Sequence, residues 1–482
     1  MATEALKQSL TPVVPSAAMR RVLPWLVAVA FFMESLDTTI LNTAVPIVAK
    51  AIGTTPLNMK AVLASYTLSL AVFIPVSGWV ADRFGTRRVF ASAIGIFTLG
   101  SLLCGLMSNV HLLVACRVLQ GCGGAMMVPV GRLTLVRTFP KSQLLGAMNF
   151  VAIPAWIAPM VGPAAGGFIV AYLHWRAIFF LNIPVGLAGL VLVWKMLPDY
   201  RERTKPLDII GLILFGAGLA LLSYVLEVFG EHRLSAPEIL GLLFVSLALL
   251  FGYGVHAERT RWPLLRLGLF RIRSFAAAVG GGFITRLGIG GVPFLLPLLY
   301  QVGLGFSPVQ SGLLIMPQAV AGLSTKIWIA QLLRRFGYRT VLIGNTLLMS
   351  VFLMLFATIG IGTPVWLIVL QAFCYGALTS TQYTSMNTLT YADVTPWKTS
   401  AASSLASTSQ QLSISFGVAV AGLCTMFFVP EAARSSPREM IWGLHAAFLA
   451  LGIFTVISTV AFSRLKPQDG ADETRQKDIH LG

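Results

Sequence analysis

The sequence predicts an all-α protein that crosses a membrane many times, with two halves of six helices each and two additional helices between them. Of its 482 residues, 56% are hydrophobic and only 11% are charged, whereas about 25% of the residues in an ordinary soluble domain are charged. The apolar residues gather into long runs, and about 20 such residues cross a hydrocarbon core of about 30 Å. A short basic motif also recurs in the second half of the chain, which is typical of two parallel halves.

The apolar runs predict fourteen membrane spans. They are expected at 22–48, 58–81, 89–107, 111–134, 143–168, 178–197, 207–228, 237–257, 274–300, 309–333, 338–360, 364–389, 400–428 and 441–463. With the N-terminus in the cytoplasm, most of the 35 Lys and Arg residues fall on cytoplasmic segments, so the positive-inside rule places both termini there. The net charge of +17 therefore indicates topology and contact with lipid headgroups, and we expect no nucleic-acid binding.

The charged stretches near the middle of the sequence divide the chain into parts. Residues 1–21 are expected to form a cytoplasmic N-terminal segment; they show no signal-peptide cleavage site, so the first span should stay in the mature protein. The two six-helix halves are expected at 22–197 and 274–464. Between them, 198–273 should hold the two additional helices and their cytoplasmic linkers. The polar tail, 465–482, is expected to be disordered and cytoplasmic.

The first span carries two carboxylates about halfway along its length, Glu34 and Asp37. A charge at that depth costs a few kcal/mol, so an ionisable residue there usually faces a bundle interior or a wet cavity and has a function. The two acids are three positions apart and therefore share one helix face. The structural alternative is that they only join helices together with the threonine and asparagine side chains nearby. Because two acids on one face exceed what packing needs, we expect them to bind protons.

The turn after the second span has the sequence Gly-Trp-Val-Ala-Asp-Arg-Phe-Gly-Thr-Arg-Arg over residues 78–88. Gly85 permits a tight reversal, and the arginines hold the turn on the cytoplasmic face. We expect Asp82 to pair with these arginines or to lie against the positive N-terminus of another helix, although a solvated loop could have the same sequence. Residues 335–339 repeat the motif, but Arg334 stands where Asp82 does in the first copy.

Residues that are unusual in a membrane helix interrupt the fourth and fifth spans. Arg117 lies about two turns inside the membrane and needs a partner, for which Asp37 is at a compatible depth. Such a pair could take part in proton coupling or could be purely structural. In the fifth span, two prolines and three glycines predict a bend and a close-packed face, which could be merely architectural. They are Pro159, Gly162, Pro163, Gly166 and Gly167.

These segments together resemble the major facilitator superfamily. The turn resembles the signature loop between helices 2 and 3 of that family, where the loop acts as a conformational latch. The matching residues are Gly78, Asp82, Arg83, Gly85, Arg87 and Arg88. The segment around Arg117 resembles an arginine motif implicated in proton coupling, which we assign to Arg117 together with Asp37 and Glu34. The proline and glycine series resembles the antiporter motif of exporting branches.

Two further segments resemble the fourteen-helix drug:proton antiporter family within that superfamily. Residues 36–46 fit the string L-D-T-T-I-x-N-x-A-x-P, and residues 175–184 fit W-R-x-I-F-x-x-N-x-P. The resemblance extends over about residues 22–465. It implies the major facilitator fold and export driven by a proton gradient.

The second half carries polar residues that are candidates for a substrate cavity. The internal repeat places Arg286 at the position equivalent to Glu34, and Lys326 is another cation within a predicted span. The span at 364–389 is unusually polar and contributes Gln382 and Asn387. Side chains of this kind can line a cavity, but they can also join helices together, and we expect most of them to do the latter.

The predicted function is secondary transport across the bacterial inner membrane. The sequence has no Walker loop, so ATP hydrolysis is not the expected energy source. No catalytic triad or metal-ligand spacing stands out, so we expect neither an enzyme nor a cofactor or metal. We expect a monomer that exchanges protons for drugs or other small amphipathic compounds. The alternatives are a metabolite exporter of narrow specificity and a proton-coupled importer; a membrane enzyme or receptor would need a polar catalytic loop or an attached soluble domain.

Overall fold

The described part of the chain is a bundle of helices. The structure is a computed structural model that describes residues 17–202, 204, 206–228, 235–395, 398–428, 437–466 and 468–469. Within these ranges the chain is almost entirely helical and contains no β-strand, which confirms the predicted all-α class. Most of the predicted N-terminal segment and most of the predicted tail lie outside the described residues.

The helices follow the predicted spans closely. In the first half they are α2 (Ala17–Ala51), α3 (Lys60–Phe84), α4 (Thr86–Leu106), α5 (Val110–Thr138), α6 (Lys141–Tyr172), α7 (Ala177–Phe180) and α8 (Asn182–Met196). Next come α9 (Ile209–Val228) and α10 (Ala236–Arg259). The second half has α11 (Arg273–Phe275), α12 (Gly282–Ile289), α13 (Val292–Leu298), α14 (Pro308–Ser324), α15 (Ile329–Leu355), α16 (Val365–Ala392), α17 (Thr399–Phe428) and α18 (Pro437–Ser463).

Eleven helices in the described ranges are long and apolar enough to cross a membrane. The predicted spans 143–168 and 364–389 overlap α6 and α16, whereas 309–333 overlaps α14 but ends inside α15; these three spans are not among the eleven. The structure therefore confirms a polytopic helical protein, while the count of fourteen spans stays a prediction.

The predicted span at 274–300 is helical but irregular. Between Arg273 and Gly303 the α-helical turns are interrupted by two π-helical stretches, Ala276–Gly281 and Leu299–Gly303. Glycines and prolines are frequent here, and both residue types weaken the regular hydrogen-bond ladder of a helix. Because its backbone hydrogen bonding is weakened in this way, we expect this segment to bend more easily than a regular α-helix.

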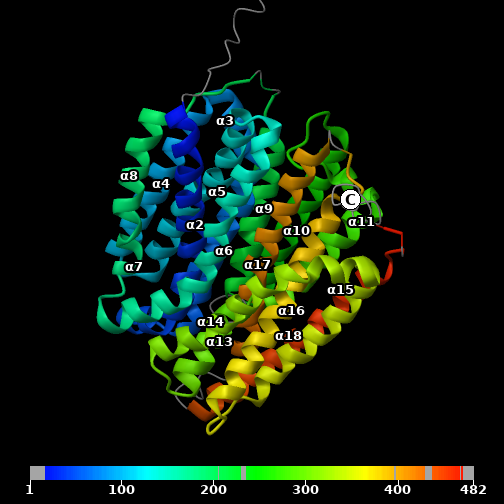
Figure 1. Cartoon of the computed structure of the whole chain (residues 1–482). Coiled ribbons are helices and arrows are strands. Elements are labelled where there is room, and N and C mark those ends of the chain that lie inside the picture. Colours follow the sequence, from blue (N-terminus) through cyan, green and yellow to red (C-terminus); the bar gives the residue numbers. More distant parts are fainter. Residues whose placement is uncertain are drawn as a thin grey trace, which may run out of the picture.

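The two halves are joined by two pairs of packed helices. Figure 1 shows the first half, from α2 to α8, on one side of the molecule and α15, α16 and α18 on the other. Helix α6 of the first half packs against α14 of the second, and α3 packs against α17. The additional helix α9 packs beside α10 and also contacts α3 and α17, so it covers one of these two seams.

The halves are closed against each other at the end of the molecule remote from Ala17. One hydrophobic cluster there combines Val48 of α2 with Phe294 and Leu298 of α13. The Gln301 side chain donates a hydrogen bond of 2.8 Å to the Thr43 carbonyl oxygen, which also links the two halves. A continuous apolar seal therefore closes this end.

Glycines of the fifth predicted span let α6 lie directly against α2. A Cβ on Gly162 would overlap Thr39, and a Cβ on Gly166 would overlap the carbonyl oxygen of Ile40. Helices can approach this closely only where small residues face each other. Pro159 of the same series is exposed.

The same helix face continues into the other half. A Cβ on Gly167 would overlap the carbonyl oxygen of Pro308 at the start of α14, and a Cβ on Gly312 of α14 would overlap the carbonyl oxygen of Pro163. The contact is therefore reciprocal, because each helix presents a glycine to the backbone of the other. The predicted close-packed face is thus a contact between the halves as well as within one half.

We expect Gly166→Ala to destabilise the protein by about 1–3 kcal/mol, because the new methyl group overpacks the α2–α6 contact. Gly146→Ala is the matched control on the same helix, since no atom lies within 4 Å of its added Cβ and alanine favours a helix more than glycine does. Thermal unfolding of both purified variants measures the difference. Equal melting temperatures for the two variants would contradict the close packing.

Candidate functional site

A buried polar cluster surrounds Asp37 on α2. The Asp37 side chain is 2% exposed, and the side chain of Arg117 on α5 is 1% exposed. Arg117 Nη1 lies 2.5 Å from Asp37 Oδ2. The other carboxylate oxygen accepts hydrogen bonds from Gln120 at 2.8 Å and from Asn182 at 3.1 Å. The Asp37 carboxylate therefore has a donor on each oxygen, and the structure brings together the two residues that the sequence proposed as partners.

The helices place these donors by simple periodicity and close packing. Arg117 and Gln120 are three positions apart on α5 and therefore face the same side. Gly100 on α4 makes room for that helix, because a Cβ at Gly100 would overlap the backbone of Gln120. Asn182 is the first residue of α8, so the cluster joins four helices of the first half.

A second layer of contacts fixes the side chains of the cluster. The Arg117 guanidinium lies 4.3 Å from the centre of the Tyr66 ring and donates a hydrogen bond of 2.8 Å to Gln120 Oε1. Asn182 also donates to Ser101 Oγ at 3.0 Å, and Ser101 donates to the Phe179 carbonyl oxygen. A buried ion pair is tolerable only when its remaining donors and acceptors are satisfied, and this cluster meets that requirement almost completely.

Glu34 lies in a different environment from Asp37. It lines a cavity of about 1300 Å³ and is half-buried. The contact within hydrogen-bond range of its carboxylate is a weak one of 3.5 Å from Ser35 Oγ, and no ion pair joins Glu34 to another described residue. Arg132 of α5 lines the same cavity, with its guanidinium 5.5 Å from the Phe31 ring. The two acids of the first span are thus divided between a sealed cluster and an open cavity.

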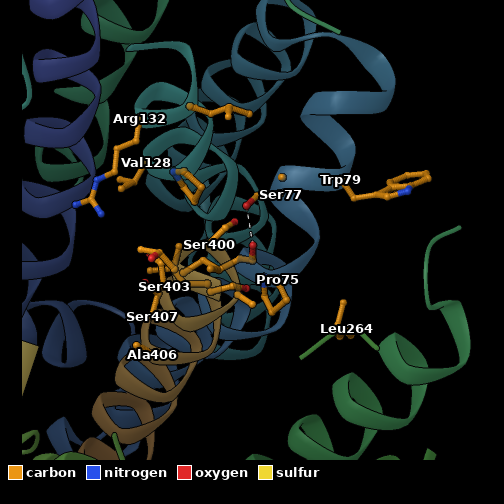
Figure 2. A pocket seen from close by; sticks show the side chains of 18 of the residues that line it. Pro75, Ser77, Trp79, Val128, Arg132, Leu264, Ser400, Ser403, Ala406 and Ser407 are labelled. Carbon is orange, nitrogen blue, oxygen red and sulfur yellow. Dashed lines mark hydrogen bonds between the residues drawn. The ribbon is translucent and has the colours of Figure 1, made fainter. Parts of the chain in front are cut away.

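The cavity lies between the halves and reaches the end of the molecule opposite the apolar seal. Its lining includes residues at helix ends and in connecting segments, such as Asp82, Glu202 and Thr399. Figure 2 shows Ser400 and Ser403 of α17 among the side chains that line it. A cavity that is closed at one end and open at the other is the arrangement expected of one state of an alternating-access transporter.

The turn between α3 and α4 is held by a residue that the sequence analysis missed. Arg137, at the end of α5, lies 2.7 Å from Asp82 Oδ1 and 2.8 Å from Glu202 Oε1. This corrects the expected partner of Asp82, since the carboxylate pairs with neither the arginines of its own turn nor a helix terminus. The reason is geometric: the end of α5 lies beside the end of α3, whereas the arginines of the turn point elsewhere.

A different acid occupies the helix terminus. Asp199 Oδ1 accepts a hydrogen bond of 3.2 Å from the backbone N–H of Arg87, in the first turn of α4. Gly85 has a φ of +97°, a conformation that favours glycine, so its predicted role in the reversal fits the backbone. Thr86 exchanges hydrogen bonds of 3.0 Å with the backbone around Tyr200. The segment after α8 therefore clamps the turn.

The remaining residues of the predicted latch have fewer contacts. Arg83 and Arg88 are exposed. The Arg87 guanidinium lies 6.0 Å from the Trp194 ring. Gly78 lines the cavity, and a Cβ there would meet no atom within 4 Å. The hydrogen bonds and ion pairs of Asp82, Thr86 and Arg87 stay within the first half and the segment that follows α8.

Of the four cavity candidates in the second half, Asn387 lines the cavity. Gln382 does not; it is fully buried and bonds to Asn345 and Thr346, so it joins α16 to α15. Lys326 also lies outside the cavity, in an exposed turn after α14, and donates to Thr384 at 2.5 Å. The correction for Gln382 has a simple reason. Polar side chains in membrane helices can join helices as well as line a cavity, and the sequence analysis left both uses open.

Arg286 lies one layer behind the cavity wall. Its side chain is 4% exposed, its Nη2 is 3.5 Å from Asn387 Oδ1, and its guanidinium is 5.1 Å from the centre of the Tyr383 ring. Within the described residues Arg286 forms no ion pair, and its Nε has no hydrogen-bond partner. Arg117 therefore has the acidic partner that the sequence predicted, whereas Arg286 has none among the described residues.

The sequence contained signals for two of the missed residues. Gln120 follows Arg117 by one helical turn, and Asn182 is the polar residue of the segment at 175–184. A polar side chain on the same face as a buried arginine is a natural partner for the same carboxylate. Arg137 and Asp199 gave no such signal, because basic and acidic residues at helix ends are common.

Comparisons with known proteins identify relatives over almost the whole chain. A family model described as the Major Facilitator Superfamily matches residues 27–418 and 278–481. The chain is 40% identical over 463 residues to a putative multidrug resistance protein MdtD of Serratia proteamaculans, covering 95% of this chain and 96% of the relative. It is 43% identical over 447 residues to the MdtD protein of Escherichia coli O157:H7, covering 92% and 94% of the two chains.

Solved structures show the same fold at low sequence identity. A bacterial homologue of the human lysosomal transporter Spinster, in an inward-facing and unoccupied conformation, has a TM-score of 0.64 at 14% identity, covering 96% of this chain and 99% of that one. A POT family transporter in complex with a thioalcohol-conjugated peptide has a TM-score of 0.67 at 14% identity, covering 91% and 95%. At this identity the likeness concerns the fold alone.

We expect Arg117→Met to destabilise the protein by about 3–5 kcal/mol, because it leaves the Asp37 charge buried without its partner. The double change Asp37→Leu with Arg117→Met removes both charges and should be closer to the wild type. Arg132→Met, at an exposed arginine of the same helix, is the control and should change stability by less than about 0.5 kcal/mol. Thermal unfolding of these variants and of Asp37→Leu alone gives the comparison, and additive effects of the two substitutions would disprove the coupling.

Proposed function

Because the chain belongs to the major facilitator superfamily, we propose that it is a proton-coupled antiporter that exports drugs or other small amphipathic compounds across the bacterial inner membrane. Its relatives over nearly the full length are described as multidrug resistance proteins. The observation that carries the proposal of proton coupling is the Asp37 carboxylate, sealed inside the first half and bonded to Arg117. A membrane protein keeps an ionisable pair at this depth chiefly where it serves a function.

Asp37 has the contacts of a carboxylate that has released its proton. Arg117, Gln120 and Asn182 all donate to it, and an ionised carboxylate accepts hydrogen bonds at both oxygens. Proton binding would weaken its attraction to Arg117. A second conformation, in which α5 moves Arg117 away from α2, would favour the protonated carboxyl group. Proton binding and conformation are coupled in this way, and each proton bound shifts the balance between the two states.

The cavity supplies the route for substrate. It reaches the end of the molecule that carries Asp82 and Glu202, which the topology argument assigns to the cytoplasm. An exporter takes up its substrate in such an inward-open state. The cavity of about 1300 Å³ is large enough for a drug-sized molecule, since ligand pockets commonly measure about 300–1000 Å³. Glu34 and Arg132 on its wall are available for polar contacts with the substrate.

The turn at Asp82 is proposed to act as a latch between conformations. In the described state Arg137 holds Asp82 and Glu202 together, and the turn is tied to the first half. When the cytoplasmic ends of the halves approach each other, the turn would come close to the second half. At that step Asp82 would lose its contact with Arg137 and gain a contact with the second half. The difference in free energy between these two contacts would then set the relative stability of the two states.

We expect Asp37→Asn to abolish export driven by a pH gradient, because an amide cannot bind and release the coupling proton. The measurement is accumulation of ethidium in inside-out proteoliposomes with an imposed gradient. Glu34→Gln should retain part of the activity, and Glu258→Gln, at an exposed acid of α10, is the control that should retain all of it.

Three results would overturn the proposal. The first is wild-type pumping by Asp37→Asn, which would place proton coupling elsewhere. The second is transport that follows ATP and ignores an uncoupler. The third is a gradient that drives ethidium out of the same vesicles, which would indicate import instead of export.

We expect Asp82→Asn to lower the transport rate by about fivefold at equal expression, since a half-exposed ion pair contributes at most about 1 kcal/mol. Arg137→Gln should lower the rate at least as much, because it also removes the contact with Glu202, and the double variant should be no worse than Arg137→Gln alone, because the contact with Asp82 is already lost there. Arg83→Gln changes an exposed arginine of the same turn and should leave the rate unchanged. Equal rates for Asp82→Asn and Arg83→Gln would show that the turn has no latch role.

A further inference from the structure

The cavity between the halves has two chemically different walls. The wall from α2, α3 and α5 is largely apolar, as at Ile74 and Val128, and also carries Glu34 and Arg132. The wall from α16 and α17 includes no Asp, Glu, Lys, Arg or His among its lining residues. It consists mainly of hydroxyl and carboxamide groups. The cavity is therefore two-sided, with an apolar side that bears charges and a polar side that bears none.

The polar wall follows one face of α17. Ser400, Ser403 and Ser407 line the cavity and recur at helical spacing, so they share a face. Figure 2 shows these three serines along one side of the helix. Leu405 and Leu412 alternate with them and are buried on the opposite side. Farther along the same face, Gln410 and Gln411 continue the wall.

Side chains on this face keep their hydrogen-bonding capacity. The side chains of Ser403, Ser407 and Gln411 form no hydrogen bond with another described residue. Ser413, on the buried side of the same helix, behaves differently and donates to the Gln410 carbonyl oxygen at 2.8 Å. Hydroxyls in helices commonly satisfy themselves in this way. The donors and acceptors of the polar wall are thus left for water or for a ligand.

The acids at the cavity mouth are already engaged. Asp82 and Glu202 share Arg137, and Asp208 lies 2.7 Å from His256 Nε2. Among the lining residues this leaves Glu34 as an acid without an ion pair, and Arg132 on the same wall opposes it in charge. Arg266, in the segment before α11, also lines the cavity, and its guanidinium lies 6.0 Å from the Trp262 ring. The part of the cavity formed by the helices thus holds one unpaired acid and one base, which together offer little net attraction for a formal charge. Most of the cavity's unpaired donors and acceptors are the uncharged hydroxyl and carboxamide groups of the polar wall.

We propose that the cavity binds uncharged amphiphiles that carry a polyhydroxyl head group, such as aryl or alkyl glycosides. The head group lies against Ser403, Ser407 and Gln411, and the apolar body lies against the opposite wall. Hydroxyls both donate and accept, as serine does, and a carboxamide offers both functions as well. A ligand without hydroxyls would displace water from this wall and leave its groups unpaired, which lowers affinity. This inference rests on the proposed export function, because it names the class of compound exported.

The test uses the full-length protein in lipid nanodiscs without a pH gradient. The probes are 4-methylumbelliferyl β-D-glucoside and 7-methoxy-4-methylcoumarin, which share the aromatic body and differ in the sugar. Equilibrium dialysis against empty nanodiscs gives the Kd of each. We expect the wild-type protein to bind the glucoside about tenfold more tightly than the methoxycoumarin. This comparison alters the ligand alone, so it does not depend on the folding of a variant.

A variant then locates the site. Ser403→Ala with Ser407→Ala should weaken glucoside binding about tenfold, the effect of two uncharged hydrogen bonds, and should leave methoxycoumarin binding unchanged. Ser413→Ala removes a hydroxyl from the buried face of the same helix and should change neither Kd. Equal affinity of the wild-type protein for the two probes would overturn the proposal. So would a double variant that weakens both probes alike or neither.

The binding experiment can fail or succeed independently of the proposed antiport mechanism. Binding without a gradient does not require Asp37 to exchange protons, so the Kd of the wild-type protein for the glucoside is measured independently of whether the protein pumps. Glucoside binding without gradient-driven export would refute the antiporter and support the substrate class. If the protein instead exports tetraphenylphosphonium with a proton gradient and does not bind the glucoside, the substrate class is refuted and the antiporter stands.

Discussion

The cost of holding an ionised carboxylate inside a bilayer is the constraint on which the first half of this protein depends. Asp37 is tolerated because α5 supplies Arg117 and Gln120 and because α8 begins with Asn182. Those donors reach it only because glycine at position 100 lets α4 and α5 lie almost in contact. The packing of these helices therefore follows from the need to solvate one charge with protein groups.

The two halves share a repeat but use charge differently. The first half pairs its buried arginine with an acid, whereas Arg286 of the second half faces the Tyr383 ring and the Asn387 carboxamide. An aromatic face and a carboxamide stabilise a cation less than a carboxylate does, but they do not change with protonation. The proton response that we propose therefore belongs to the first half. The second half offers a wall whose charge stays constant.

The sequence predicted the fold class and the main pair of the site because those features depend on local signals. Membrane depth alone was sufficient to relate Asp37 to Arg117, since both interrupt apolar runs. The partner of Asp82 was not predictable, because Arg137 lies on a different helix and nothing in its neighbourhood distinguishes it from other basic residues at helix ends. The use of Gln382 was also undetermined, since a polar side chain on a membrane helix can face a cavity or another helix, and rotation by one residue decides between them.

The reciprocal contact between α6 and α14 limits how the sequence can diverge. Gly167 meets the backbone of Pro308, and Gly312 meets the backbone of Pro163. A larger residue at either glycine would push the helices apart and open the other contact at the same time. Such a change would be tolerated only with a compensating change on the facing helix. Positions 167 and 312 should therefore covary among homologues even though they lie in different halves. The residues of the α6–α14 contact should change together in evolution.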